Sequence, residues 1–281
     1  MSGSVTYLYG VAEALPALGD VVAGLTGVAG APVRVVAEED LAGVVSAVPA
    51  ADFEERPLAA HLEDLEWLEA VARAHHGVVD AVAGRATVLP LRLATIYRDD
   101  ERVRDLLRTG RAAFRSRLSR LAGHVEWGVK VYADPSAAAP APTGSAGSRG
   151  SERSEGGGPG GEELSPGRAY LLGRRRERTA RDDAHRAAAE AAGRIHEAAR
   201  AHAVEHVRHR VQHGPLVRER GENIGNDAYL VPVDASEAFL AAVREAAGSD
   251  AAVRAEVTGP WAPYSFAADA AVEPEEEATP G

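Results

Sequence analysis

The chain has 281 residues, a formal net charge of −11 and no cysteine, and only 5% of its residues are aromatic. This length allows about two domains, and the acidic balance argues against a nucleic-acid binder, which needs basic surface to neutralise phosphates. Without cysteine there are no disulfides, thiolate metal sites or cysteine nucleophiles, so we expect an intracellular protein.

Alternating apolar residues predict the strands of the first part of the chain. They lie at residues 5–11, at 33–37 and 41–48 as a hairpin, at 88–97, and at 125–132, where the last strand closes the domain. Helices are predicted between these strands. This order predicts a ferredoxin-like α+β domain over residues 1–134.

Two long helices are predicted in this domain. The first starts near Pro57, which suits a first helical turn, and its end is expected near His75 and His76, where cationic side chains favour the helix dipole. The second is capped by Asp99 or Asp100. The apolar stripe of the first helix is Leu58, Leu62, Leu65, Leu68 and Val71.

Residues 135–163 are rich in Gly, Ser, Pro and Ala and show no apolar period, so they are expected to form a disordered linker. A second α+β domain is predicted over residues 164–270, and residues 271–281 form a short acidic tail. The elements predicted in the second domain are a strand at 168–172, a long helical segment at 174–213, a strand at 228–233, a helix that Asp234 and Glu237 open as a capping box, and a strand at 253–258.

The strongest candidate for a metal site in the sequence is a series of histidines within the long helical segment. His202, His206, His209 and His213 follow one another at helical spacing and would share one face, an arrangement that lets imidazoles converge on a metal. The same positions continue an apolar stripe of the helix, so structural or solvated histidines are the favoured interpretation and no metal site is assigned. The alternative is a metal- or small-ligand-binding enzyme that uses these four residues.

Three of the few aromatic residues fall within six positions near the carboxyl end. Trp261, Tyr264 and Phe266 stand in the segment TGPWAPYSF, residues 258–266, where Pro260 and Pro263 fix the backbone and exclude a helix. The segment therefore predicts a rigid platform at the end of a strand. Two roles stay open for it: the aromatic residues seal the edge of the core, or they contact a partner.

The segment TGPWAPYSF resembles the carboxyl-terminal signature of the gas vesicle protein F/L family, accessory proteins of microbial flotation shells. Four earlier segments are also similar to the family, in family order: YLYGV at 7–11, VLPLRLA at 88–94, EWGVKVY at 126–132 and NDAYLVP at 226–232. The resemblance implies two domains, a ferredoxin-like one followed by a modified α+β one with a long helical segment. It also implies an accessory protein rather than an enzyme, without a cofactor.

The functional expectation follows from this resemblance. The protein would bind the small hydrophobic shell protein and other accessory proteins during vesicle assembly, as a chaperone or nucleation factor or as a minor shell component. No secretory signal opens the sequence, and no apolar run approaches the roughly 20 residues that span a bilayer. We therefore expect a cytoplasmic, vesicle-associated protein that contacts neither membrane nor nucleic acid.

Overall fold

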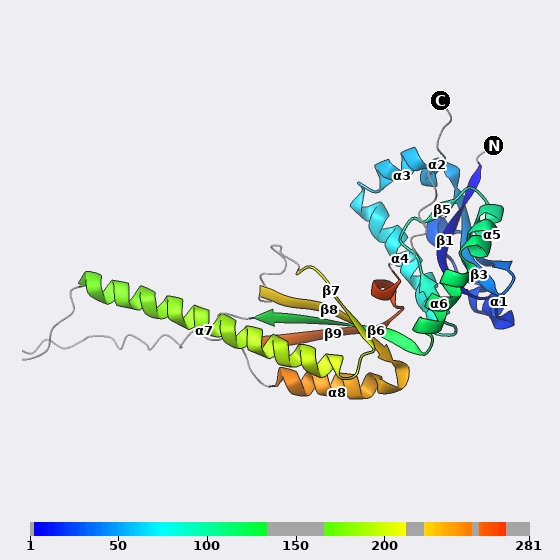
Figure 1. The fold of residues 1–281 in the computed structure, drawn as a ribbon. Helices are drawn as coiled ribbons and strands as arrows, with labels where there is room; N and C mark the ends of the chain where they lie inside the picture. Colours follow the sequence, from blue (N-terminus) through cyan, green and yellow to red (C-terminus); the bar gives the residue numbers. More distant parts are fainter. Residues whose placement is uncertain (1–2, 134–165, 212–221, 249–252, 268–281) are drawn as a thin grey trace, which may run out of the picture.

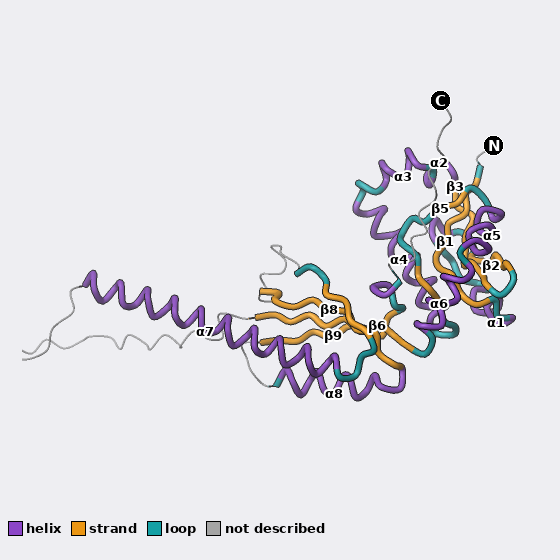
Figure 2. Tube along the Cα trace, viewed as in Figure 1, coloured by secondary structure: helices purple, strands orange, loops and turns teal. Residues whose placement is uncertain are grey.

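The computed structural model describes residues 3–133, 166–211, 222–248 and 253–267 (Figure 1). In these ranges the chain forms one five-stranded and one four-stranded antiparallel sheet with helices packed on them, which confirms the α+β class. The molecule is elongated, and helix α7 reaches far beyond the second sheet (Figures 1 and 2). The predicted linker, residues 135–163, and the acidic tail, residues 271–281, lie outside the described residues.

The first sheet is built around β1 (Ser4–Glu13), which is buried from Val5 to Ala12 because helices cover both faces. Such burial explains why this strand reads as a nearly continuous apolar run. The predicted hairpin is confirmed, and its turn places Glu39 at φ 52°. The other strands are β2 (Val33–Glu38), β3 (Leu41–Pro49), β4 (Val88–Pro90) and β5 (Ile96–Tyr97), in the order β2-β3-β1-β4 with β5 also paired to β1.

Two groups of helices cover this sheet. The ring of Phe53 and the valines of α4 (Leu65–Ala83) pack with Tyr7 and Tyr9 on one face, and Leu107 and Leu118 pack on the other face with Leu8. The helices of the first group are α1 (Pro16–Val22), α2 (Ala50–Phe53), α3 (Glu55–His61) and α4 (Leu65–Ala83), near the short turn η1 (Val28–Gly30). Those of the second are α5 (Asp100–Thr109) and α6 (Arg111–Leu121).

The prediction of one continuous helix from Pro57 is wrong. Helix α3 ends at His61, and the Asp64 carboxylate caps the new helix α4 by accepting the backbone N–H groups of the next turn at 3.0 and 3.3 Å. Because the chain restarts at this cap, the predicted stripe is interrupted. Leu62 and Leu65 are 41% and 78% exposed.

The strand predicted at residues 88–97 is also interrupted. Pro90, which ends β4, has no N–H group to continue the ladder. Ala94 then lies in the left-handed region at φ 61°, and its N–H group donates to the Tyr7 hydroxyl at 3.0 Å. Of residues 88–97, only those of β4 and β5 therefore pair with β1, and a loop joins these two short strands.

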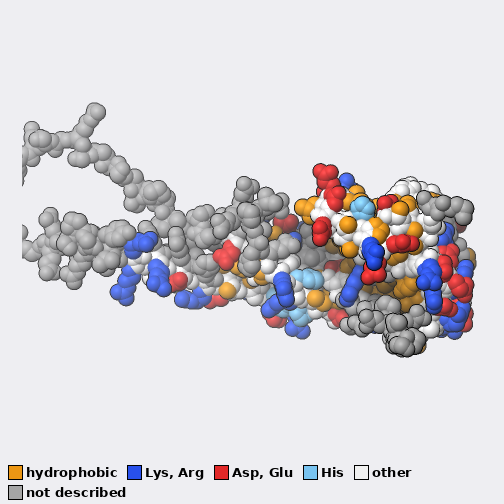
Figure 3. Space-filling model, turned by 90° about the horizontal axis from the view of Figure 1, so that it is seen from above, with side chains coloured by type: hydrophobic (Ala, Val, Ile, Leu, Met, Phe, Trp, Pro, Cys, Tyr) orange, Lys and Arg blue, Asp and Glu red, His pale blue; other side chains and the backbone are white. Residues whose placement is uncertain are grey.

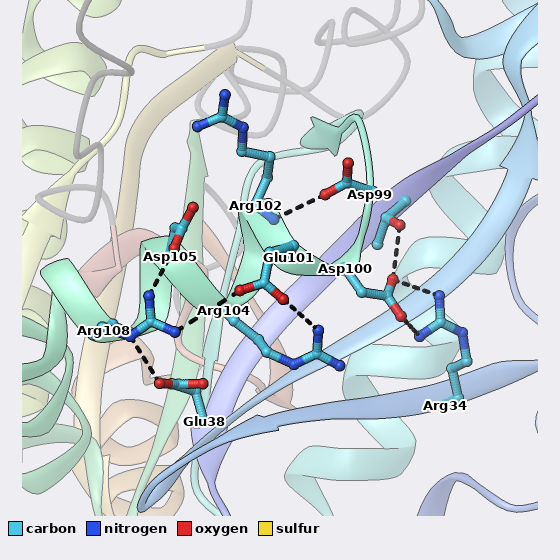
Figure 4. A network of polar contacts seen from close by, with 10 residues as sticks. Arg34, Glu38, Asp99, Asp100, Glu101, Arg102, Arg104, Asp105 and Arg108 are labelled. Atoms are coloured by element: carbon cyan, nitrogen blue, oxygen red, sulfur yellow. Dashed lines mark hydrogen bonds and ion pairs between the residues drawn. The ribbon is translucent and has the colours of Figure 1, made fainter.

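Helix α5 begins at the predicted cap, where Asp99 accepts the backbone N–H of Arg102 at 3.0 Å. The next residue, Asp100, accepts two hydrogen bonds from the Arg34 guanidinium, at 2.6 and 2.7 Å, and one from the Thr6 hydroxyl at 3.0 Å (Figure 4). The bonds from Arg34 hold the pKa of Asp100 below its usual value. Helix α5 is thereby fixed to β2 and β1.

The second sheet has the order β7-β8-β6-β9, and the placement of β6 (His124–Ala133) corrects a prediction. The sequence predicts that this strand closes the first domain, whereas it is a central strand of the second sheet. Its alternation reveals one buried face but not what covers it: Trp127 and Val129 pack on helices α7 and α8. The other elements are β7 (Glu205–Arg208), β8 (Glu222–Pro232), the short turn η3 (Val233–Ala235), α8 (Ser236–Ala247) and β9 (Val253–Trp261).

The long helix α7 spans Pro166–Arg200, which contradicts both the strand predicted at 168–172 and the helix predicted to continue to residue 213. After Arg200 the chain turns and forms β7, whose Val207 pairs with Ala228 of β8. Val204, which the sequence places in the helical segment, therefore lies directly before a strand. The predicted capping box of α8 is absent too, because Asp234 lies in η3 and Ala235 occupies the cap position without a side-chain bond.

The hydrophobic core joins the two sheets. One cluster combines Leu8 and Val11 of β1 and the apolar face of α6 with Leu230 of β8. Phe266 and Ala267, beyond the end of β9, belong to the same cluster. The chain's carboxyl-terminal described residues therefore pack against its first strand.

Candidate functional site

The aromatic residues singled out in the sequence lie in a junction segment, residues 259–267, that begins in the last three residues of the edge strand β9 and continues beyond it. Gly259, at φ 129°, opens the segment, and a Cβ atom there would lie 2.8 Å from the Glu126 carbonyl oxygen and 3.0 Å from the Trp127 ring. Only glycine fits this combination of backbone angle and close approach. The peptide between Gly259 and Pro260 is cis.

The three aromatic side chains of the junction segment have separate environments. Phe266, 4% exposed, lies in the core cluster that joins the sheets. Tyr264, in the short turn η4 (Tyr264–Phe266), packs against the other face of the first sheet, with its ring 6.1 Å from that of His75 and 5.0 Å from that of His76. Trp261 is 47% exposed. Tyr264 and Phe266 thus contribute to the core, and Trp261 presents an aromatic surface to solvent.

A polar anchor formed by Glu126, Ser265 and His209 fixes the junction segment. The Glu126 carboxylate accepts the Ser265 backbone N–H at 2.8 Å and its hydroxyl at 2.6 Å, and His209 Nε2 lies 2.9 Å from the same hydroxyl oxygen. Burial raises the pKa of Glu126, and the two bonds from Ser265 oppose this shift. Arg120 of α6 also donates to the Phe266 carbonyl at 2.7 Å.

The anchor contains the residue types of a catalytic triad but not its connections. In a triad the carboxylate orients the histidine, which then activates the serine. Here the Glu126 carboxylate accepts directly from the Ser265 hydroxyl instead of orienting His209, which contacts the same hydroxyl. The geometry is that of a structural anchor between β6, the end of β7 and the junction segment. No sequence signal connects these residues, because 139 positions separate Glu126 from Ser265.

His75 lies inside helix α4 rather than at its end, so the predicted capping role for His75 and His76 is wrong. The His75 side chain is buried, with Nδ1 2.9 Å from the Tyr7 hydroxyl. Burial, with a smaller contribution from His76, lowers the pKa of His75 to about 4. The ring is therefore neutral near neutral pH. Burial also raises the pKa of Tyr264, whose hydroxyl has no hydrogen-bond partner among the described residues.

The predicted histidine face does not exist, because helix α7 ends before it. His202 lies in the turn after α7, His206 lies in β7, His209 follows that strand, and His213 is outside the described residues. His206 contacts the rings of His196 and Tyr229, at 5.0 and 6.2 Å, whereas His209 belongs to the anchor. Within the described ranges no group of three or more His, Cys, Asp or Glu side chains is placed to hold a metal ion.

Trp261 stands at the end of β9, an edge strand that pairs with β6 on one side only within the described part of the sheet. A rigid aromatic side chain beside an open sheet edge is a favourable place for a partner to bind. Large hydrophobic side chains are also exposed elsewhere: Leu15, Leu62, Leu65, Val204 and Val233. Among the described helices, none is both long and apolar enough to cross a membrane.

Comparison with known proteins connects this fold to gas vesicles. The family model described as "Gas vesicle synthesis protein GvpL/GvpF" matches residues 5–268. Gas vesicle protein L of Streptomyces sp. (strain CB03234) is 42% identical over 261 residues, which cover 93% of this chain and 92% of that protein. Gas vesicle protein F of the same strain is 30% identical over 267 residues, covering 93% and 98%.

Two solved structures are similar in fold. The crystal structure of GvpF from Anabaena sp. PCC7120 has a TM-score of 0.62 and 20% identity, covering 94% of this chain and 96% of that one. That of GvpF from Microcystis aeruginosa has a TM-score of 0.60 and 20% identity, covering 94% and 98%. At this identity the likeness concerns the fold alone.

Proposed function

Because the chain belongs to the GvpL/GvpF family of gas vesicle proteins, we propose that it is an accessory protein of vesicle assembly that binds the small hydrophobic shell protein. It acts in the cytoplasm, together with other vesicle accessory proteins, and is not an enzyme. The observation that carries the proposal is the family match over residues 5–268. Whether it acts as a chaperone or nucleation factor or stays in the wall as a minor component is a further choice within this role.

The physical basis of the proposal is the hydrophobic character expected of a shell subunit. Such a subunit must be kept from aggregating before it joins the wall, and a partner can shield it by covering apolar surface. Trp261 supports this role, because its ring is 47% exposed beside an open strand edge. The anchor below it holds the backbone of the junction segment in place, so little side-chain and loop entropy is lost when a partner binds.

The test is co-expression with the small shell protein, followed by measurement of the shell protein that stays soluble and copurifies. We expect a soluble complex with the unchanged chain and a large loss with Trp261→Ala. Leu15→Ala is the matched control, because Leu15 is similarly exposed, at 46%, and lies in the first part of the chain. Circular dichroism must show that both variants are folded.

The possible outcomes distinguish shell-protein binding itself from the surface that makes the contact. A complex that survives Trp261→Ala unchanged would place the contact elsewhere and leave the function supported. No complex from well-folded, unchanged protein would contradict shell-protein binding itself.

We propose that the chain divides into two α+β units, each related to the ferredoxin-like fold, and that residues 135–163 form a linker inside the second unit, between β6 and α7. Since β6 pairs with β8 and β9, the boundary between the units would fall before β6 rather than after it. Limited proteolysis tests the linker, because early cleavage confined to residues 135–163 is the expected pattern.

A further inference from the structure

An acidic corner, residues 50–70, lies at the first-sheet end of the molecule. It comprises α2, α3 and the start of α4, and it holds seven acidic residues against one arginine. Leu62 and Leu65, 41% and 78% exposed, alternate in the sequence with Glu63, Asp64 and Glu66. In Figure 3, hydrophobic and acidic side chains gather around a histidine at this end.

Aromatic contacts and a helix cap hold the backbone of the acidic corner in place. The Trp67 ring stacks on that of His61 at 5.0 Å and contacts the buried Phe53 ring at 5.4 Å, and Asp64 caps helix α4. The exposed leucines therefore sit on a fixed base. An apolar centre with an acidic rim fits a partner that offers positive charge on long aliphatic stems, as arginines on a helix do.

The outer part of α7, residues 166–186, has the opposite charge. It contains seven arginines against three acidic residues, in a chain whose net charge is −11. The buried residues of α7 lie beyond it, from Ala188 to Ala199, where the helix packs on the second sheet. Arg174, Arg175 and Arg178 are exposed, and basic side chains follow the helix in Figure 3.

We infer that the outer part of α7 from one molecule binds the acidic corner of a second copy of the chain. The two surfaces lie at opposite ends of the molecule in both views, so they do not meet within one copy (Figures 1 and 3). Arginine guanidinium groups pair with the corner's carboxylates, and their aliphatic stems cover Leu62 and Leu65. Because the net charge of each molecule is repulsive, this local complementarity determines the orientation.

The contact joins different surfaces of the two copies. A heterologous interface of this kind leaves one free helix and one free corner on every pair, so it continues into chains unless the rotation closes a ring. Screening weakens pairs of exposed charges, so the association is expected to weaken as salt is raised.

Sedimentation velocity of the full-length chain over a range of concentrations tests the inference. At low salt the sedimentation coefficient should rise with concentration, and high salt should reverse the rise. A helix variant, Arg174→Glu with Arg175→Glu and Arg178→Glu, and a corner variant, Leu62→Ser with Leu65→Ser, should each remain monomeric. A control with the same charge change at exposed positions outside both surfaces, Arg85→Glu with Arg92→Glu and Arg98→Glu, should still associate.

An equal mixture of the helix variant and the corner variant gives the sharpest result. Each retains one intact surface, so the mixture should form one-to-one dimers and nothing larger. If circular dichroism shows that the corner variant is misfolded, Glu63→Arg with Glu66→Arg replaces it.

Monomeric behaviour of the unchanged chain at every concentration, or a mixture that stays monomeric, would overturn the inference. So would unchanged association of either variant. If the unchanged chain is monomeric and the corner variant loses shell-protein binding, the acidic corner would be assigned to the shell protein instead.

Discussion

The junction segment and the acidic corner use similar side chains in opposite ways. Both hold large hydrophobic residues close together in the sequence, and both contain a proline or a capping residue that fixes the backbone. In the junction segment Phe266 is 4% exposed and joins the two sheets, whereas in the acidic corner Leu65 is 78% exposed and joins nothing within one copy. Clustered apolar residues therefore mark both kinds of position, and the packing around them decides which is structural.

The largest expected change in the free energy of unfolding distinguishes these two regions directly. Phe266→Ala should reduce the free energy of unfolding by about 3–5 kcal/mol, because it leaves a cavity in the core between the sheets. Leu65→Ala, the matched change in the acidic corner, should alter it by less than about 0.5 kcal/mol. Urea unfolding of both variants measures the difference. Equal losses would show that the two regions are not distinguished by packing.

The second effect concerns the buried histidine next to the junction segment. His75 has a folded-state pKa of about 4 against 6.5 in a model peptide, so between these values the unfolded chain binds a proton that the folded chain does not. Stability is therefore lost as pH falls from 6.5 towards 4, by up to about 1.4 kcal/mol per pH unit. Glu126, whose pKa is raised, acts in the opposite direction.

A variant isolates the histidine's contribution to this pH dependence. His75→Gln should flatten the dependence of unfolding free energy on pH between 6.5 and 4. Urea unfolding at several pH values measures it for both proteins. An identical slope in the variant would contradict the assignment.

The next effect tests the glycine that opens the junction segment. Gly259→Ala should destabilise the fold by about 1–3 kcal/mol, because φ 129° is unfavourable for alanine and the new Cβ atom would meet the Glu126 carbonyl. Gly193→Ala, in helix α7 with open space around it, is the control and should be neutral or stabilising. Thermal unfolding compares the two. A stable Gly259→Ala variant would mean that the segment adopts another backbone.

The smallest effect is expected at the anchor. Ser265→Ala removes the hydroxyl bond to Glu126 and the contact with His209, but it keeps the backbone bond to the carboxylate. The expected loss is about 1–2 kcal/mol. Hydrogen exchange of the junction segment should increase locally, by more than at the acidic corner. Exchange that changes equally in both regions would indicate general destabilisation.

The sequence predicts the local elements better than their partners. The hairpin across Glu39 and the cap at Asp99 depend on neighbouring residues, so they could be recognised and are confirmed. The placement of β6 in the second sheet depends on residues of β8 and β9 that lie far along the chain, and alternation carries no such information. The strand β7 was hidden because residues 202–213 fit helical spacing as well as strand alternation.

The candidate site was predicted only in part for the same reason. The aromatic cluster at 261–266 was visible in the sequence, and so was the rigidity that its prolines give. The sequence does not show that Trp261 alone of the three is exposed, because this depends on how the chain turns at Gly259 and binds Glu126. The four histidines do not share a helical face, because helix α7 ends at Arg200.

We propose that this member of the GvpL/GvpF family binds the small shell protein. The most direct measurement is the amount of shell protein that stays soluble and copurifies when it is co-expressed with the unchanged chain, compared with the shell protein expressed alone. We expect a stable complex and a clear increase in soluble shell protein. Well-folded protein that neither binds the shell protein nor increases its solubility would contradict it.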